Sequence, residues 1–91
     1  MTRDEGFALV RGRLGDSATL AHCLACEACM RRLAEKLGGD VEEWGLAGLV
    51  HDLDLDVCAE DPDRHTVVGA EVLRAHGAPE SVVEAVLGHN D

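Results

Sequence analysis

The sequence predicts an all-α fold, a compact bundle of about five helices forming one domain over residues 1–91. Apolar residues recur at helical spacing in most segments, and Gly or Pro residues separate these segments. No segment shows the sustained two-residue alternation or the Asn-Gly or Asp-Gly turn of a β-hairpin. Because Phe7 and Trp44 are the only Phe, Tyr or Trp residues, the core must consist mainly of Leu, Val, Ala and Cys.

The first two predicted helices have clear boundary signals. Thr2 followed by Glu5 is typical of a capping box, so a first helix is expected to run to about residue 14. A second, longer helix is expected to begin near Asp16 and to end at Leu37, because Gly38 and a second glycine follow.

Three shorter helices are expected in the second half of the chain. Asp40 is a typical N-cap for a third helix, and Pro79 suits the first turn of a fifth. The expected elements are a helix over 41–53, an acidic loop over 54–63, and helices over 64–76 and 79–89.

The second helix contains a C-x2-C-x2-C run formed by Cys23, Cys26 and Cys29. Ferredoxin-type iron–sulfur sequences continue this run with a further cysteine, where Leu33 stands here. On a helix these thiols drift by about 60° per step, so they cannot close around one cluster. We interpret them as core packing; a single metal ligand or redox thiol, and a cluster, are the alternatives. Cys58 is interpreted as an incidental thiol.

Histidines gather near the expected helix ends and inward faces. His22 shares a helical face with Cys26, Cys29, Leu33 and Leu37, and this face is predicted to be the core stripe of the second helix. The other members of the set are His51 with Asp52, His65 and His89. Imidazole and carboxylate groups together suit divalent Mn, Fe, Co, Ni or Zn, in a hydrolytic site with room for water.

Each of these residues also has a structural explanation. His22 could be a hydrogen-bonded core histidine, His51 with Asp52 a simple pair, and His65 a surface residue. His76 is assigned a structural or exposed role, because it lies eleven residues, about 16 Å, beyond His65 on one predicted helix.

The net charge of −10 argues against binding to nucleic acid and to anionic membranes. The N-terminal segment lacks the continuous apolar stretch of a signal peptide, and no apolar run is long enough for a transmembrane helix. The sequence therefore predicts a cytoplasmic protein with reduced thiols.

The motifs resemble those of the HD-domain superfamily of metal-dependent phosphohydrolases, with the small HDIG-type hydrolases most similar. The resemblance starts near residue 18 and rests on His22, "GLAGLVHDLDLD" and "HTVVGAEVLRAHGAPESVVEAVLGHND". It implies a helical bundle around a central metal. It also implies ligand roles for His22, His51 and Asp52, a second ion at His65 and His89, and small or apolar residues at the cysteine positions.

Two features depart from the resemblance. HD domains complete the first metal site with an aspartate on a later helix, whereas this sequence stops at Asp91. A fragment, a site completed by a partner chain and a degraded site would each explain this. The loop after Asp52 is also unusually acidic. We expect it to be solvated, although Asp54 or Asp56 could support the site or act as a base.

The predicted function is hydrolysis of a phosphate mono- or diester by a metal-activated water, with Asp52 and Asp54 as catalytic residues. One or two divalent ions (Mn, Fe, Co, Ni, Zn or Mg) would serve as cofactor. The expected substrate is a small phosphorylated molecule such as a nucleotide, and a homo-oligomer is compatible with the sequence. The alternatives are a non-catalytic metal-binding or interaction module with an incomplete site, and a thiol or iron–sulfur protein.

Overall fold

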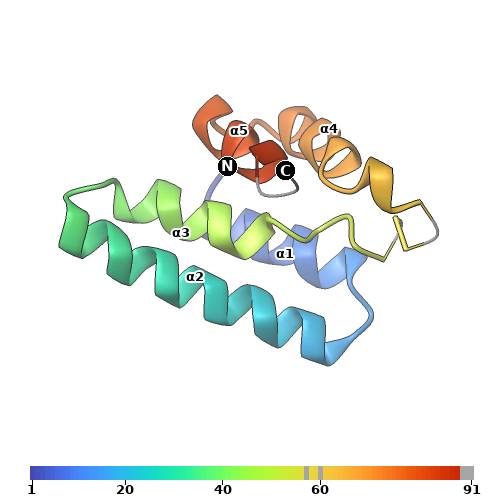
Figure 1. Cartoon of the computed structure of the whole chain (residues 1–91), viewed down its shortest axis with the longest axis horizontal. Coiled ribbons are helices and arrows are strands. Elements are labelled where there is room, and N and C mark those ends of the chain that lie inside the picture. Colours follow the sequence, from blue (N-terminus) through green and yellow to red (C-terminus); the bar gives the residue numbers. More distant parts are fainter. Residues whose placement is uncertain (57, 60, 89–91) are drawn as a thin grey trace.

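A computed structural model describes residues 1–56, 58–59 and 61–88. Every regular element in these ranges is helical, which confirms the all-α prediction (Figure 1). The elements are α1 (Arg3–Arg13), α2 (Ser17–Leu37), α3 (Val41–Val50), the 3-10 turn η1 (Pro62–Arg64), α4 (Val67–Ala75) and α5 (Glu80–Gly88).

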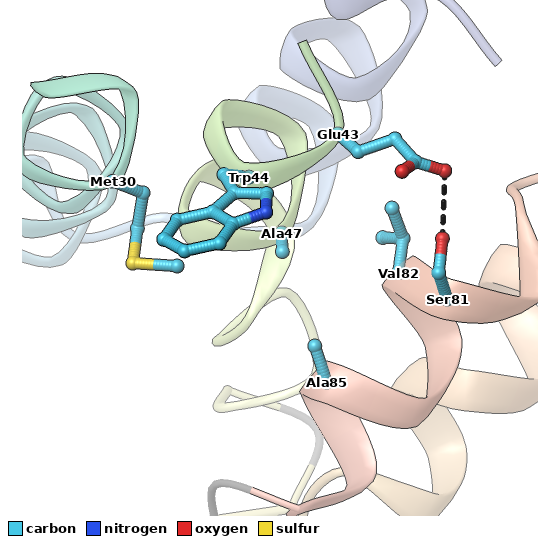
Figure 2. Close-up of a pocket in the computed structure, with 7 residues that line it drawn as sticks. All are labelled: Met30, Glu43, Trp44, Ala47, Ser81, Val82 and Ala85. Carbon is cyan, nitrogen blue, oxygen red and sulfur yellow. Dashed lines mark hydrogen bonds between the residues drawn. The ribbon is translucent and has the colours of Figure 1, made fainter. Parts of the chain in front are cut away.

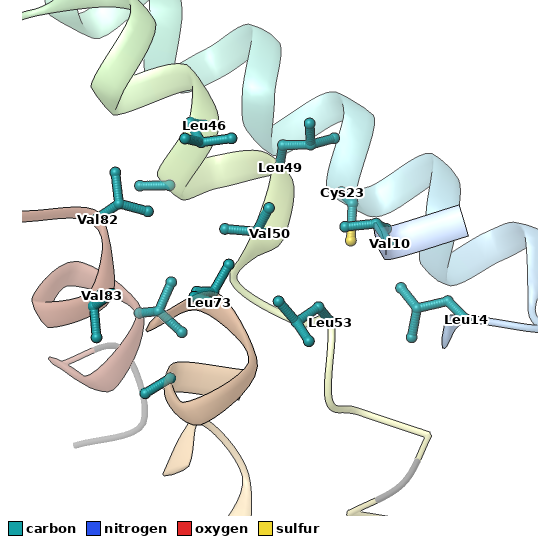
Figure 3. Close-up of a cluster of buried hydrophobic side chains, with 13 residues drawn as sticks. Val10, Leu14, Cys23, Leu46, Leu49, Val50, Leu53, Leu73, Val82 and Val83 are labelled. Atoms are coloured by element: carbon teal, nitrogen blue, oxygen red, sulfur yellow. The ribbon is translucent and has the colours of Figure 1, made fainter. Parts of the chain in front are cut away.

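The helix α3 lies at the centre of the molecule. It packs antiparallel to α2 and also contacts α1 and α5, while α4 packs against α5 (Figure 1). Leu49 and Val50 of α3 are fully buried among Val10, Cys23 and Leu73 from three other helices (Figure 3). The end of α3 is therefore held rigidly, and the residues that follow it start from a fixed position.

Local capping explains the helix ends. The hydroxyl of Thr2 accepts the N–H of Glu5 at 3.1 Å, and the Glu5 carboxylate accepts the N–H of Thr2 at 2.7 Å, which confirms the capping box. Asp16 caps α2, and Gly38, with φ of +77°, ends it as predicted. Asp40 accepts the N–H of its third following residue at 3.1 Å and so begins α3.

Two predicted helices are shorter than expected. The helix α3 ends at Val50 and α4 begins at Val67, so His51, Asp52 and His65 lie in turns outside the helices. The prediction of a solvated loop is also wrong in part, because Asp54 is 1% exposed and Cys58 is buried. The predicted end of the fifth helix, at His89, lies outside the described residues.

The predicted core stripe of α2 is wrong. Its buried positions are Cys23, Glu27 and Ala34, whereas Leu33 and Leu37 are 46% and 71% exposed. The face is rotated because Glu27 enters the interior with its charge paired to a guanidinium, which an apolar pattern does not anticipate.

The thiols of α2 consequently lie in three different environments. Cys23 is fully buried, Cys26 is half-buried and Cys29 is exposed, so core packing is confirmed for Cys23 and wrong for Cys29. None of these three, nor Cys58, forms a disulfide within the described residues. Among the described helices, none has both the length and the apolar character needed to cross a bilayer. The cytoplasmic location stays a prediction.

Candidate metal centre

Asp52 lies at the centre of a cluster of imidazoles. Its Oδ2 atom is 3.4 Å from Nε2 of His22 and 3.2 Å from Nε2 of His51, while its Oδ1 atom is 3.3 Å from Nε2 of His65. The Nε2 atoms of His22 and His51 are 3.3 Å apart. Ring nitrogens and carboxylate oxygens of four predicted metal ligands thus lie close together. The four residues come from α2, the turn after α3 and the turn before α4.

The orientation of His51 is fixed by the backbone of α3. Its Nδ1 atom lies 2.7 Å from the carbonyl oxygen of Gly48, one helical turn earlier. Because a carbonyl only accepts hydrogen bonds, Nδ1 must carry a proton, so in the neutral ring the lone pair is on Nε2 and is directed at the cluster.

The orientation of His65 is fixed by Asp54. The Nδ1 atom of His65 donates to Oδ1 of Asp54 at 2.5 Å, and Oδ2 accepts the N–H groups of Thr66 and Gly69 at 2.6 and 2.8 Å. A carboxylate hydrogen-bonded to one ring nitrogen fixes the orientation of an imidazole. Asp54 therefore acts as a positioning residue in this geometry; its predicted catalytic role stays a prediction.

The same carboxylate explains the late start of α4. Thr66 adopts a φ of +75°, a conformation that costs a non-glycine residue roughly 1–3 kcal/mol. The N–H groups that Asp54 accepts belong to this turn and to the first turn of α4, so Asp54 takes the place of a side-chain cap. Gly69 allows the approach, since a Cβ there would lie 3.2 Å from Oδ2 of Asp54.

Close packing of α2 on α3 brings the two halves of the cluster together. A Cβ atom on Gly48 would lie 2.7 Å from the carbonyl oxygen of Cys26, which is closer than real contacts allow. Glycine at this position lets the two backbones touch one turn before His51. The contact places His22 and Cys26 opposite His51.

Cys26 belongs to the cluster, although the sequence interpretation assigned it to core packing. Its Sγ atom lies 3.6 Å from Nε2 of His22, and one donor atom from each of His22, Cys26 and His51 lies within 4.8 Å of the others. The available signal was its spacing of four residues from His22, which places both on one helical face.

Two titratable groups of the cluster have shifted pKa values. Burial, followed by the charge of Asp52, raises the pKa of the Cys26 thiol. Burial is the largest single influence on His51 and acts to lower its pKa, but the hydrogen bonds to Asp52 and Gly48 together raise the pKa above its ordinary value. A metal bound here would compete with protons on both groups.

The donor set fits a divalent metal. Imidazole nitrogens and a carboxylate oxygen are suitable ligands for borderline ions such as Zn, Fe, Co or Mn. The side chain of His22 is 54% exposed, so its predicted burial in the core is wrong, and one side of the cluster faces solvent. Water and substrate can reach the ligand atoms from this side.

An apolar pocket of about 250 Å³ lies beside the cluster. Its lining includes His51, Cys26, Met30 and Ala85, from α2, the α3 end and α5. A second pocket of about 210 Å³ shares Met30 and Ala85 and extends past Trp44 (Figure 2). At its far side, the hydroxyl of Ser81 donates to Glu43 at 2.7 Å and links α5 to α3 (Figure 2).

Two other residues of the sequence analysis, Asp56 and His76, lie away from this centre. His89 lies outside the described residues. Asp56 is exposed and accepts the N–H of Gly15 at 2.9 Å. His76 is exposed at the end of α4, with Nδ1 2.9 Å from the Val72 carbonyl, which confirms its structural or exposed assignment.

Comparison with known families agrees with this arrangement, since residues 19–91 match the model of the HD domain. The chain belongs to the HD domain family. Its curated relatives include proteins named Ribonuclease Y from Cutibacterium acnes, 33% identical over 73 residues, and from Thermosipho melanesiensis, 32% identical over 71 residues. A Ribonuclease Y from Geobacter metallireducens is 37% identical over 59 residues.

The match covers only part of these relatives. It spans 79% of this HD-domain chain but 14% of the Cutibacterium acnes protein, and 65% of the chain but 11% of the Geobacter metallireducens protein. No solved structure gives a significant match. Membership of the family supports a metal-dependent hydrolase. The relatives are much longer proteins, and their substrates are not assigned to this chain.

Proposed function

We propose that this HD domain is a metal-dependent phosphohydrolase that cleaves a phosphodiester in a small, nucleotide-like substrate. The observation that carries the proposal is the convergence of Nε2 of His22, Nε2 of His51 and Oδ2 of Asp52 within 3.2–3.4 Å of one another. A divalent ion held by these residues would supply a water of lowered pKa and would neutralise negative charge on the phosphoryl oxygens.

The residues of the chain prepare the site for this chemistry. The Gly48 carbonyl keeps the His51 ring oriented, and Asp54 does the same for His65. Asp52 presents Oδ2 to His22 and His51, and Oδ1 to His65. These residues would therefore hold one or two ions. With a net charge of −10, the chain needs that cationic charge locally to attract a phosphate.

The apolar pocket and the relatives support a diester substrate. The pocket beside His51 offers an apolar surface to a base or another leaving group attached to the phosphate. The relatives are named ribonucleases, and a ribonuclease acts on RNA, whose linkages are phosphodiesters. An RNA strand is therefore the second candidate substrate, although the acidic chain offers little to bind its backbone.

The test is a comparison of substrates with the purified chain loaded with Mn²⁺, Co²⁺ or Zn²⁺. We expect faster hydrolysis of bis(p-nitrophenyl) phosphate and a dinucleotide than of p-nitrophenyl phosphate or an oligoribonucleotide. His51→Gln should abolish turnover, whereas His76→Gln, the matched exposed histidine, should retain it.

The possible results separate the candidates. Preferential cleavage of the oligoribonucleotide would favour the RNA substrate. A metal-loaded chain with no turnover of any substrate would contradict the proposal and favour a non-catalytic metal-binding module.

A further inference from the structure

We propose that Cys26 is a ligand of the same metal ion, so that His22, His51, Asp52 and Cys26 form a four-ligand site selective for Zn²⁺ or Co²⁺. The inference rests on the proposed function, because it assumes that the centre binds a metal. It adds a thiolate ligand and thereby narrows the identity of the ion.

The distances between the donor atoms match the edges of a tetrahedron around one zinc ion. Zn–N and Zn–O bonds near 2.05 Å with tetrahedral angles place two such ligand atoms about 3.3 Å apart. The corresponding separations among His22, His51 and Asp52 are 3.3, 3.4 and 3.2 Å.

The sulfur of Cys26 lies next to the same donor atoms. A Zn–S bond near 2.3 Å beside a Zn–N bond gives a tetrahedral S···N separation of about 3.5–3.6 Å. The Sγ atom of Cys26 lies 3.6 Å from Nε2 and 3.9 Å from Nδ1 of His22, and a donor atom of His51 lies within 4.8 Å of both residues. The sulfur therefore lies beside the His22 ring, and coordination requires a side-chain rotation that brings it in front of Nε2.

The fold selects Cys26 from the three thiols of α2. Cys23 is fully buried in the hydrophobic core, and Cys29 is exposed one turn further along the helix. Cys26 alone of the three lies four residues from His22, at the point where Gly48 lets α2 touch α3. Backbone packing therefore holds its sulfur at the centre.

The chemistry of sulfur determines the preferred ion. On binding, the Cys26 thiol loses its proton to the solvent and a thiolate–metal bond forms. Thiolate favours zinc and other soft or borderline ions, whereas Mg²⁺ and Mn²⁺ favour oxygen ligands. Zinc can expand to five ligands, so water can still enter from the exposed side of His22.

Cobalt spectroscopy of the full 91-residue chain tests the assignment. The metal-free, reduced chain is titrated with Co²⁺ under anaerobic conditions. We expect a thiolate-to-cobalt charge-transfer band in the near ultraviolet, intense visible bands of a tetrahedral ion, stoichiometric displacement by Zn²⁺ and no displacement by millimolar Mg²⁺.

Substitutions at Cys26 and Cys29 show which thiol gives rise to the charge-transfer band. Cys26→Ser should abolish the charge-transfer band and weaken Co²⁺ binding about 100-fold or more, while Cys29→Ser should retain both. Cys26→Asp should recover much of the affinity without the band, since a carboxylate replaces the thiolate. Helical circular dichroism of each variant shows whether the fold is kept.

The outcomes distinguish this inference from the proposed function. Co²⁺ binding without a charge-transfer band in the unmodified chain, or an unchanged band in Cys26→Ser, would overturn the Cys26 assignment and leave the hydrolase proposal standing. Failure of Co²⁺, Zn²⁺ and Mn²⁺ to bind at all would overturn both.

Discussion

Two mostly buried carboxylates, Glu27 in α2 and Asp52 after α3, have different partners: arginines for Glu27 and histidines for Asp52. The side chain of Glu27 is 9% exposed, and its oxygens accept from Arg3 at 2.8 and 2.9 Å and from Arg31 at 3.5 Å. The side chain of Asp52 is 13% exposed and faces imidazole nitrogens, including Nε2 of His51. Burial alone therefore does not separate a structural carboxylate from a functional one.

The partners differ in whether their charge is permanent. The guanidiniums of Arg3 and Arg31 are cationic at any pH that the fold tolerates, so they neutralise Glu27 without a ligand. Imidazoles lose their proton near neutral pH, and a neutral imidazole is a metal ligand. The Glu27 cluster is thus complete as folded, whereas the Asp52 cluster can exchange protons for a divalent ion. The two clusters should respond differently to substitution.

The largest effect is expected for Asp52→Asn. An amide keeps the shape of the side chain but removes the negative charge that serves both sides of the centre. Hydrolysis of a phosphodiester should fall on the order of 1,000-fold, with a parallel loss of metal affinity. The stability of the metal-free chain should change much less than the activity, because the imidazole partners are only conditionally charged. Urea unfolding in the presence of a chelator measures this stability.

A smaller loss of activity, with a loss of stability, is expected for Gly48→Ala. The new Cβ would meet the carbonyl oxygen of Cys26 at 2.7 Å, so α2 must move away from α3. Overpacking of this kind costs about 1–3 kcal/mol, and a displacement near 1 Å at the centre reduces turnover about 100-fold. The control is Gly12→Ala in α1, where a Cβ meets no atom within 4 Å and should stabilise the chain by about 0.4–1 kcal/mol. Unchanged turnover in Gly48→Ala would contradict the role of this contact.

Asp54→Asn should have an intermediate effect on the His65 side. The amide oxygen can still accept from the N–H groups of Thr66 and Gly69, but its NH₂ group then faces Nδ1 of His65. His65 must become an acceptor at Nδ1, which moves its proton to Nε2 and removes the lone pair directed at Asp52. Metal affinity or activity should fall about 10–100-fold, and the buried site should lose about 1–3 kcal/mol of unfolding free energy.

Metal titration and thermal unfolding measure the two losses in Asp54→Asn. The matched control is Asp56→Asn, an exposed carboxylate two residues later that should affect neither. Equal effects of the two substitutions would contradict a positioning role for Asp54.

The sequence predicted the features that depend on local chemistry. The capping box at Thr2 and the glycine end of α2 need only a few neighbouring residues, and the structure has both. The grouping of His22, His51 and Asp52 was predicted by motif spacing and by family resemblance, and their ligand atoms do converge.

The features that depend on contacts distant in sequence were not predicted. Cys26 joins the cluster only because its backbone packs against Gly48, 22 positions later. Asp54 was expected in a solvated loop, but it is buried as the cap of a helix whose start was itself predicted wrongly. The core face of α2 was wrong because a buried Glu27 depends on Arg3 of another helix.

The smallest effect, and one on stability alone, is expected for Glu27→Gln. The hydrogen bond from Arg3 is the main cause that lowers the pKa of Glu27 in the folded chain below its ordinary value. The stabilisation is therefore fully present above the unfolded-state pKa of about 4.3, and it is lost as the pH falls through the lower folded-state pKa.

The substitution should cost about 1–2 kcal/mol at pH 7, less than a fully buried pair because Arg3 is partly exposed. The difference from the unmodified chain should shrink below about pH 4, as protonation removes the same charge from Glu27. Urea unfolding at pH 7 and pH 3 measures this difference in unfolding free energy. The control is Glu35→Gln, because the ion pair of Glu35 with Arg32 is exposed. Because Glu27 pairs with Arg3 and Arg31 and Asp52 faces imidazoles, Co²⁺ affinity of the folded variant should be unchanged. A tenfold loss would show that the two carboxylates are coupled through α2.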